Sequence, residues 1–355
     1  MALSKVNPNL ITQGASRKNL IINGAMQVAQ RGTTGTLNNG GSGFHSADRF
    51  YSAEEGGFTG AFTVSNDTDS PKGFSNSTKW ECTTADTSLA ADDTFFMDYK
   101  PEAQDLQHLN YGTSDALQMT MSFWIKSNKT GTYVIWLYQY DDNRHVQMQY
   151  TINTADTWEY KTLLVPADTT GVIDNDTGAG LALRFIMGAG STWTSGTAPT
   201  TWASLVTANR YVGQTVNLAD STANYMNITG LQLETGSVAT DFEHRSFGEE
   251  LALCQRYYSR TTALSGLSGC VVFYAFDSNE SWGGVFFPVT MRTTPTITVY
   301  NNAGTSGGIH RIGSPDLTGV TVNRISTTGF SQIVKNGALL ADDIYACTYT
   351  AESEL

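Results

Sequence analysis

The sequence predicts an all-β protein: an antiparallel β-sandwich, then a short helix and a smaller C-terminal β domain. Three observations predict this class. Charged residues make up only 15% of the 355 residues, and the chain has 34 Gly, 16 Phe, 16 Tyr and 7 Trp, a composition typical of short strands joined by turns. Apolar and polar residues alternate in many short segments. A convincing helical spacing of apolar residues occurs in one stretch, near residue 250.

The first 44 residues are expected to form an attachment arm. Asn19–Val28 is typical of two short strands joined by an Asn-Gly turn, because Asn23 and Gly24 both tolerate a positive φ. Gly32–Gly43 then follows as a tether with few apolar side chains. A hairpin this short cannot bury a core of its own, so it must dock on the next domain, on another copy of the chain or on a different protein.

Residues 45–244 are predicted to form the sandwich. Their clearest strand is 117–125, where strict alternation of apolar residues places one face in the core. Strand-like segments separated by turn signals continue to residue 244, with one weak helical turn at 101–109, as in antiparallel sandwiches. The core face of 117–125 carries Leu117, Met119, Met121, Phe123 and Ile125, and the other expected strands are 48–52, 60–64, 78–82, 132–140, 146–152, 158–165, 181–187, 212–218 and 225–233.

Aromatic residues on two of these strands form the first candidate ligand site. Trp136, Tyr138 and Tyr140 share one face of their strand, and Trp124 lies opposite the core face of its own. If the two strands are neighbours, these four rings could form a platform on which the apolar faces of sugars stack. The alternative is that this aromatic face packs under a loop or against the other sheet.

A long loop supplies the second candidate site. Residues 188–211 show no strand pattern and carry Trp193, Trp202 and Tyr211. Long loops in compact domains are often functional, so these rings are candidate ligand contacts. The alternative is that the tryptophans pin the loop to the sandwich.

A calcium site and a catalytic site have little support. Asp174 and Asp176 stand two apart before Gly178, which only partly matches a calcium loop, so a solvated turn is favoured and no cofactor is expected. Neighbouring carboxylates such as Asp92 and Asp93 would point to opposite faces of a strand and could not act as an acid–base pair. Known catalytic motifs are absent from the sequence, so we expect a protein that is not an enzyme.

Charge and hydropathy exclude further classes of partner. The formal net charge is −12 and no run of Lys or Arg occurs, so a nucleic-acid partner is not expected. Neither a membrane span nor a signal peptide is recognisable, so we expect a chain made in a cytoplasm and not inserted in a membrane. The four cysteines are widely spaced, and buried thiols are favoured over two disulfides.

A linking helix is predicted for residues 245–260. Ser246 and Glu249 fit a capping box, which satisfies two free backbone donors at a helix start. The helix would be short and needs a partner surface, either the neighbouring domain or the same helix in sister subunits around a threefold axis. Its apolar stripe, the candidate oligomer interface, consists of Phe247, Leu251, Cys254 and Tyr258.

Residues 261–355 are expected to form a β-rich tip domain. Short apolar segments separated by turn signals recur through this part of the chain. Such a small domain could fold alone or trimerise to complete its core. The expected strands are 270–276, 284–289, 296–300, 319–324, 329–333 and 344–350.

Four separated stretches of the chain stand out together: Asn19–Thr33 with Asp48–Phe50, Leu231–Glu243 with Leu253–Tyr258, Phe287–Pro295, and Tyr349–Leu355. They resemble a group of phage virion proteins, many from marine phages, that include tail fibres. The resemblance implies a central jelly-roll domain similar to carbohydrate-binding modules, assembly as a homo-oligomer (usually a trimer), and display on the outside of the particle. It carries over no binding residue, and it implies an architectural role for Asp48, Arg49, Gln255 and Arg256.

The leading expectation is a non-enzymatic phage virion protein, a homotrimeric tail or surface fibre that binds host-surface glycan and contacts other virion proteins through its N-terminal arm. The alternative is a purely structural virion component, such as a capsid decoration, collar or connector. A polysaccharide depolymerase is a third possibility, but the chain lacks the 20–30-residue repeat of a long β-helix.

Overall fold

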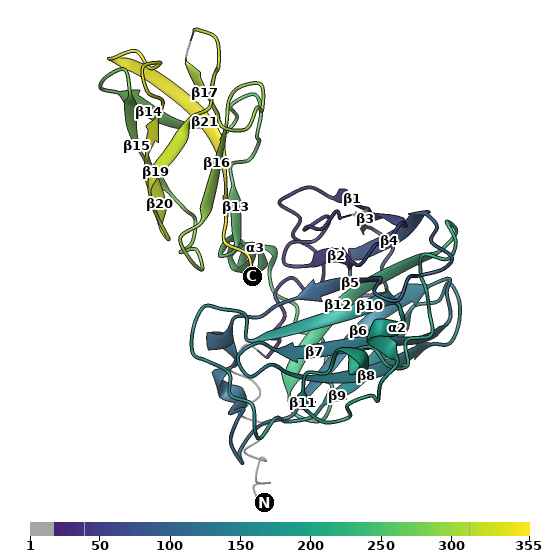
Figure 1. The fold of residues 1–355 in the computed structure, drawn as a ribbon. Helices are drawn as coiled ribbons and strands as arrows, with labels where there is room; N and C mark the ends of the chain where they lie inside the picture. Colours follow the sequence, from purple (N-terminus) through teal and green to yellow (C-terminus); the bar gives the residue numbers. More distant parts are fainter. Residues whose placement is uncertain (1–17, 39, 312) are drawn as a thin grey trace, which may run out of the picture. The chain divides into compact units, whose positions relative to one another are not determined.

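The computed structural model describes residues 18–38, 40–311 and 313–355. It divides into two compact units, which we call the sandwich unit (up to Ser246) and the C-terminal unit (Phe247–Leu355). Both are built mainly of antiparallel strands (Figure 1). The division falls shortly after the predicted end of the sandwich, and it places the predicted linking helix in the C-terminal unit.

The sandwich unit contains two six-stranded sheets whose paired strands are all antiparallel. The strand order in the first sheet is β1 (Thr34–Asn38), β3 (Ala61–Asp67), β4 (Ser77–Thr84), β12 (Tyr225–Thr235), β6 (Met119–Ser127), β9 (Glu159–Val165). In the second sheet it is β11 (Ala203–Ser204), β8 (Arg144–Ile152), β7 (Gly131–Gln139), β10 (Leu181–Ala189), β5 (Thr94–Tyr99), β2 (Tyr51–Glu55).

The core lies between the two sheets. Phe123 of β6 is fully buried, and its ring centroid lies 5.2 Å from that of Tyr150 on β8 and 5.5 Å from that of Phe185 on β10. These edge-on contacts join side chains of one sheet to side chains of the other. The predicted β-sandwich is therefore confirmed, and alternation identified the core face of β6. Leu117 is the exception, because it precedes the strand and is 41% exposed.

Two parts of the predicted strand set are wrong. The expected strand 212–218 is a loop, and β5 was missed. All six residues of β5 are buried, so it lacks the alternation of a half-exposed strand. The weak helical turn predicted at 101–109 is confirmed as the 3₁₀ helix η1 (Ala103–Leu109).

The predicted N-terminal hairpin is also wrong. Residues 19–28 contain a turn and no strand, with Asn23 in the left-handed conformation at φ 61°. The Asn23 side chain donates to the carbonyls of Val28 and Asp48 and accepts from the N–H of Val28. Ile21 and Met26 are fully buried. β1 forms inside the predicted tether, so the described part of the expected arm belongs to the sandwich unit.

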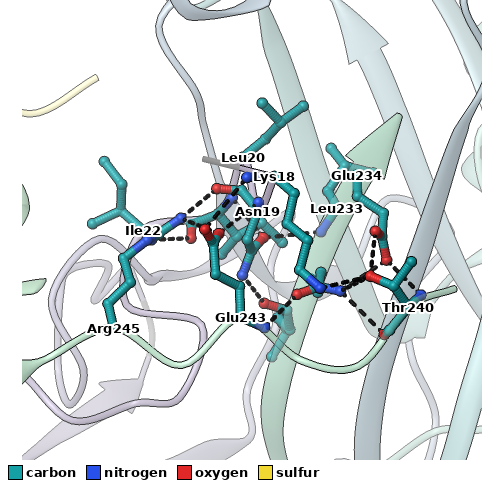
Figure 2. A network of polar contacts seen from close by, with 12 residues as sticks. Lys18, Asn19, Leu20, Ile22, Leu233, Glu234, Thr240, Glu243 and Arg245 are labelled. Atoms are coloured by element: carbon teal, nitrogen blue, oxygen red, sulfur yellow. Dashed lines mark hydrogen bonds and ion pairs between the residues drawn. The ribbon is translucent and has the colours of Figure 1, made fainter. Parts of the chain in front are cut away.

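A polar network anchors this N-terminal segment to the end of β12 (Figure 2). Asn19 Nδ2 donates to the carbonyl of Leu231 at 3.0 Å, and the N–H of Asn19 donates to Glu243 Oε2 at 2.8 Å. Arg245 donates to the carbonyls of Asn19 and Ile21. Two of the stretches that resemble phage virion proteins, Asn19–Thr33 and Leu231–Glu243, therefore meet in space.

A β-bulge in β12 allows this contact. The register with β6 shifts between Thr229 and Gln232, and Gly230 adopts φ +65°. The N–H of Leu231 then donates to the carbonyl of Gly24 at 3.0 Å. A Cβ at Gly24 would lie 2.1 Å from the Leu231 oxygen, so only glycine permits this approach.

The C-terminal unit is organised around β21 (Asp343–Glu352), which pairs with four other strands. Its core includes Phe273, Phe330 and Tyr345, all buried. The described elements are α3 (Phe247–Gln255), β13 (Tyr258–Arg260), β14 (Val271–Ala275), β15 (Glu280–Phe286), β16 (Thr296–Tyr300), β17 (Gly308–Arg311), β18 (Leu317–Thr318), β19 (Thr321–Ser326), β20 (Gly329–Val334) and β21.

The predicted helix 245–260 is shorter than expected. α3 ends at Gln255, and Tyr258 lies in β13, where it pairs with β21. Cys254 is fully buried and Phe247 is 57% exposed, so the four residues of the predicted oligomer interface do not form one exposed helical stripe. The predicted helical stripe is therefore wrong, and an oligomer interface at these residues stays a prediction.

The cysteine prediction is confirmed, because all four are free thiols and three of them are buried. Within the residues that the structure describes, no helix is both long and apolar enough to cross a membrane.

Candidate functional site

The four-ring platform predicted from the sequence does not form. Trp124 lies on β6 in the first sheet, whereas Trp136 and Tyr138 lie on β7 in the second, with Tyr140 just beyond its end. The platform required these two strands to be neighbours, but they belong to opposite layers of the sandwich. Trp124 therefore faces away from the other three rings, and two separate aromatic regions result.

The second-sheet region is covered by a loop. Trp136 is only 3% exposed and stacks on Tyr138, with 5.1 Å between ring centroids. The loop that follows β10 contains α2 (Ser191–Thr194) and η2 (Thr207–Asn209). It places the ring of Tyr211 edge-on to that of Trp136, with 5.9 Å between the ring centroids. Tyr211 is fully buried. The alternative, that this aromatic face packs under a loop, is thus what the structure shows.

An arginine completes the packing beneath this loop. Arg184 of β10 donates two hydrogen bonds to Asp98, both at 2.9 Å, and contacts Glu55 and Tyr211 Oη at 3.2 and 3.1 Å. Its guanidinium carbon lies 3.4 Å from the ring centroid of Phe96. The ion pair with Asp98, which is 2% exposed, fixes Arg184 within the sheet. The hydrogen bond from Arg184 to Tyr211 then holds the covering loop on the sheet.

The other predicted aromatic residues have separate places. Trp193 is half-buried, donates through Nε1 to the carbonyl of Asp92, and packs beside Tyr211 at 5.9 Å. Trp202 is buried and donates through Nε1 to the carbonyl of Pro166 at 2.8 Å, with its ring edge-on to Tyr111. Both tryptophans pin the loop. Of the rings around β7, Tyr140 is the most open, at 38% exposed.

The weak calcium candidate gains no support. Asp141, Asp174 and Asp176 are near one another, and burial together with the neighbouring carboxylates raises the pKa of Asp141. Asp141 and Asp142 instead accept backbone N–H groups, those of Asp174 and Val172. Among the described residues, no group of three or more His, Cys, Asp or Glu is placed to hold a metal ion.

The outer face of the first sheet carries an open groove of about 660 Å³. Its base is formed by β6, β9 and the bulge of β12, and the segment after β12 forms one wall. We call it the first-sheet groove. Its lining residues are Phe74, Ser122, Trp124, Tyr160, Thr162, Gly230, Ser237, Val238, Ala239, Thr240, Asp241 and Phe242.

Strand register places two rings side by side in this groove. Trp124 of β6 is paired directly with Tyr160 of β9, so both side chains project from the outer face. Their ring centroids are 5.2 Å apart, Trp124 is half-buried, and Tyr160 is 45% exposed. A Cβ at Gly230 would lie 2.7 Å from Phe74 and 3.1 Å from Trp124. The absence of a side chain at Gly230 therefore lets both rings approach the floor of the groove.

The wall of the groove is held by buried polar side chains of β12. Glu234 accepts from the N–H of Thr240 at 2.9 Å and from its hydroxyl at 2.6 Å. Gln232 Oε1 accepts from the N–H of Glu243 at 2.8 Å. Lys18 Nζ donates to the Thr240 hydroxyl (Figure 2). The ring of Phe242 packs edge-on to Phe74 at 5.0 Å. The wall is thus fixed by the same network that anchors the N-terminal segment.

Trp124 was a candidate ligand residue from the sequence, but as part of a different set of rings, and its partners in this groove were not predicted. Tyr160 lies in the predicted strand 158–165. Trp158 and Tyr160 alternate there with the inward-facing positions, so the alternation predicts that both rings point outward. Phe74 and Phe242 come from loops, and nothing in the local pattern brings them to β6. Among the lining residues, Asp241 is the one charged group. The groove thus offers ring faces, hydroxyls and a single carboxylate to a ligand.

Acid is expected to weaken the turn that presents Tyr160. Burial raises the pKa of Glu159, but hydrogen bonds from Lys161, Thr154 and Asn153 outweigh this effect and lower the pKa from 4.5 to about 2. The folded state thus favours the carboxylate, so its stabilisation is present above about pH 4.5 and lost as the pH falls towards 2. Glu159→Gln should have a lower free energy of unfolding than the wild type at pH 7. This difference should shrink as the pH falls from about 4.5 towards 2.

Urea unfolding of both proteins between pH 7 and pH 2 measures this difference. Asp115→Asn, which alters an exposed carboxylate in another loop, serves as the control. If the difference in free energy of unfolding between the wild type and Glu159→Gln stays constant down to pH 2, the assigned role of Glu159 is contradicted.

Comparison with known proteins yields structural likenesses only. No model of a protein family matches the chain, and no curated protein matches it. Among solved structures, the enzymatically active domain of tailspike protein 4 of Bacteriophage CBA120 is 13% identical with a TM-score of 0.31, and the match covers 61% of this chain and 21% of that one. This chain therefore spans about a fifth of the tailspike chain.

Two further similar structures contain carbohydrate-binding modules of Clostridium thermocellum. The family 11 module of a cellulosomal cellulase is 14% identical with a TM-score of 0.28, covering 59% of this chain and 98% of that one. The CBM22-1 and GH10 modules of xylanase 10B are 11% identical with a TM-score of 0.29, and the match covers 65% of this chain and 30% of that one. At these values the function has to be argued from the residues of this chain.

Proposed function

We propose that this chain is a non-enzymatic glycan-binding protein of a phage virion, and that it binds host-surface polysaccharide in the first-sheet groove. The observation that carries the proposal is the pair of rings in an open groove, Trp124 beside Tyr160, with hydroxyls and a carboxylate around them. Sugars present apolar C–H faces that stack on aromatic rings, and hydroxyls that exchange hydrogen bonds with polar side chains. The groove offers both kinds of contact.

A binding role fits the groove better than hydrolysis. Enzymes that cleave glycosidic bonds by the usual acid–base routes need two carboxyl groups on either side of the bond. The lining contributes one carboxylate, that of Asp241, beside the hydroxyls of Ser122 and Thr162. These groups can bind and orient a sugar, and they do not supply the second carboxyl group.

The proposed place on the virion surface rests on the sequence resemblance to phage virion proteins. Two of the resembling stretches meet in the network of Asn19, Glu243 and Arg245 (Figure 2). That network holds the groove wall, so the shared stretches support the proposed site in structural terms. We propose synthesis in the host cytoplasm and display on the particle, with other virion proteins as further partners.

We also propose that the chain forms a homotrimer through the C-terminal unit. Val272 and Tyr274 project from the outer face of β14, and Phe276 follows just after it; all three are exposed. Ile344 of β21 pairs directly with Tyr274 and is exposed too. An apolar sheet face of this kind is typical of an interaction surface. It replaces the helix stripe as the candidate interface, and it also favours the second candidate function, a purely structural virion component.

The interface is tested by the double variant Val272→Asp with Phe276→Asp. We expect loss of the oligomer, because charges placed in a desolvated contact are costly. Analytical ultracentrifugation measures the oligomeric state. Leu251→Asp on α3 tests the helix as the alternative interface. An oligomer that survives the double variant and dissociates with Leu251→Asp would place the contact on the helix.

Glycan binding itself is tested with the purified full chain and host-surface polysaccharide. We expect saturable binding and no shortening of the polysaccharide during incubation, measured by calorimetry and size-exclusion chromatography. Binding to no host polysaccharide and to no intact host cell, in any oligomeric state, would contradict the proposed function. Shortened polysaccharide chains would contradict the non-enzymatic part alone.

A further inference from the structure

A second aromatic cluster lies beside the first-sheet groove on the same face of the sheet. We infer that this cluster, formed by Trp158, Tyr225 and Lys126, is a second sugar subsite, and that the ligand is a glycan chain of at least two sugar units lying across both. This inference rests on the proposed function and deepens it, because it assigns a ligand class and further binding residues.

Strand register places the cluster beside the groove. Trp124 pairs with Tyr160 between β6 and β9, and the residues two positions along the same faces are Lys126 and Trp158. Residues two apart on a strand lie about 7 Å from each other and point to the same side. Trp158 immediately precedes β9, so its ring is the next one after Tyr160 along this part of the chain, and a chain of linked sugars can contact both.

Contacts around Lys126 define the subsite. Its ammonium lies 5.6 Å from the ring centroid of Trp158 and 5.9 Å from that of Tyr225, the first residue of β12. Lys126 also pairs with Asp69, and Trp158 Nε1 donates to Asp69 Oδ1 at 3.0 Å. Tyr225 donates its hydroxyl to Asp156. The polar atoms of both rings are thus engaged by carboxylates, which fixes the rings beside the Lys126 ammonium. Both rings remain partly exposed, and the ammonium can donate to sugar hydroxyls.

The charges of the subsite favour a neutral sugar. Lys126 is paired with Asp69, which supplies a donor and an acceptor. Beside Tyr225 lie the carboxylate of Asp156 and the ammonium of Lys79, the latter 5.7 Å from the ring centroid, so acidic and basic groups are mixed around the rings. The Asp69 side chain is 44% exposed, and its oxygens can accept hydrogen bonds from sugar hydroxyls. In the groove, Asp241 adds a negative charge to the lining. An anionic sugar would meet a carboxylate in each subsite, so the geometry fits hydroxyl-rich neutral units.

Chain-length dependence of binding tests the inference. The probes are size-fractionated oligosaccharides made by partial acid hydrolysis of the host-surface polysaccharide, titrated into the full-length protein. For the wild type we expect affinity to rise about tenfold from the single sugar to chains of two or more units, as one added stacking contact provides. Trp158→Ala should bind the single sugar with the affinity of the wild type, and its affinity should not increase for longer chains.

The controls separate this inference from the proposed function. Leu164→Ala changes an exposed residue on the same face of β9, at the other end of the strand. Its affinity should increase with chain length as in the wild type. Tyr225→Ala tests the subsite from a second strand, in case Trp158→Ala fails to fold. If the wild type binds and both subsite variants keep its length dependence, the inference is overturned and the proposed function stands. If the wild type binds no fraction, both are overturned.

Discussion

Replacing Trp124 by alanine is expected to weaken glycan binding about 30-fold. The indole forms the base of the first-sheet groove beside Tyr160, and removing a central aromatic contact typically costs about 2 kcal/mol of binding free energy, which corresponds to this factor. Stability should change less than for a core residue, because Trp124 is half-buried on an outer face. Calorimetric titration with host-surface polysaccharide measures the affinity, and circular dichroism checks the fold.

The matched control is Tyr138→Ala, which removes a half-buried ring from the opposite sheet. It should leave the affinity unchanged. Equal affinities of wild type and Trp124→Ala, combined with a loss of binding in Tyr138→Ala, would move the glycan site to the second sheet and contradict our assignment.

Replacing Asp98 by alanine should lower the free energy of unfolding by about 3 kcal/mol, because it leaves the buried guanidinium of Arg184 without its main partner. Glu55 and Tyr211 still contact Arg184, so we expect the lower end of the range seen for broken buried pairs. The covering loop should also loosen, since Tyr211 belongs to it. Urea unfolding followed by near-ultraviolet circular dichroism measures both effects.

Glu81→Ala is the control for this prediction. Glu81 pairs with Lys79 at 3.3 Å on the surface and is half exposed, so its removal should change stability by less than about 1 kcal/mol. If Asp98→Ala cost no more than this control, the second sheet would not be a tightly packed face, and its aromatic residues would become candidates for ligand binding again.

Much of the fold followed from local pattern. Alternation placed Met119, Met121 and Phe123 in the core, and it placed Trp124 on the opposite face, where the groove lies. Strand pairing did not follow, because which strands are neighbours depends on contacts between residues far apart in the chain. The four-ring platform depended on β6 and β7 being neighbours, and they lie in different sheets.

The N-terminal segment shows the same limit. The turn at Asn23 was expected from its tolerance of a positive φ, and the turn is present. The flanking strands do not form, because Asn19 and Gly24 bond to β12, more than two hundred residues later. The helix stripe failed for a related reason, since Tyr258 joins a sheet with β21. In both cases a long-range backbone contact outweighed a local preference.

The groove could be predicted only in part. Outward rings at Trp124 and Tyr160 were readable from alternation, but their pairing required the register of β6 with β9. Phe74 and Phe242 reach the groove from loops, and the bulge at Gly230 makes room for the rings. A site assembled from loops and a bulge leaves no periodic signal in the sequence.

The most direct test of this account is an experimental structure of the full chain with a bound oligosaccharide from the host-surface polysaccharide. We predict a sugar ring stacked over Trp124 and Tyr160 in the first-sheet groove, with the next unit over Trp158. Sugar bound on the second sheet at Tyr138 and Tyr140, with the first-sheet groove empty, would contradict the central claim.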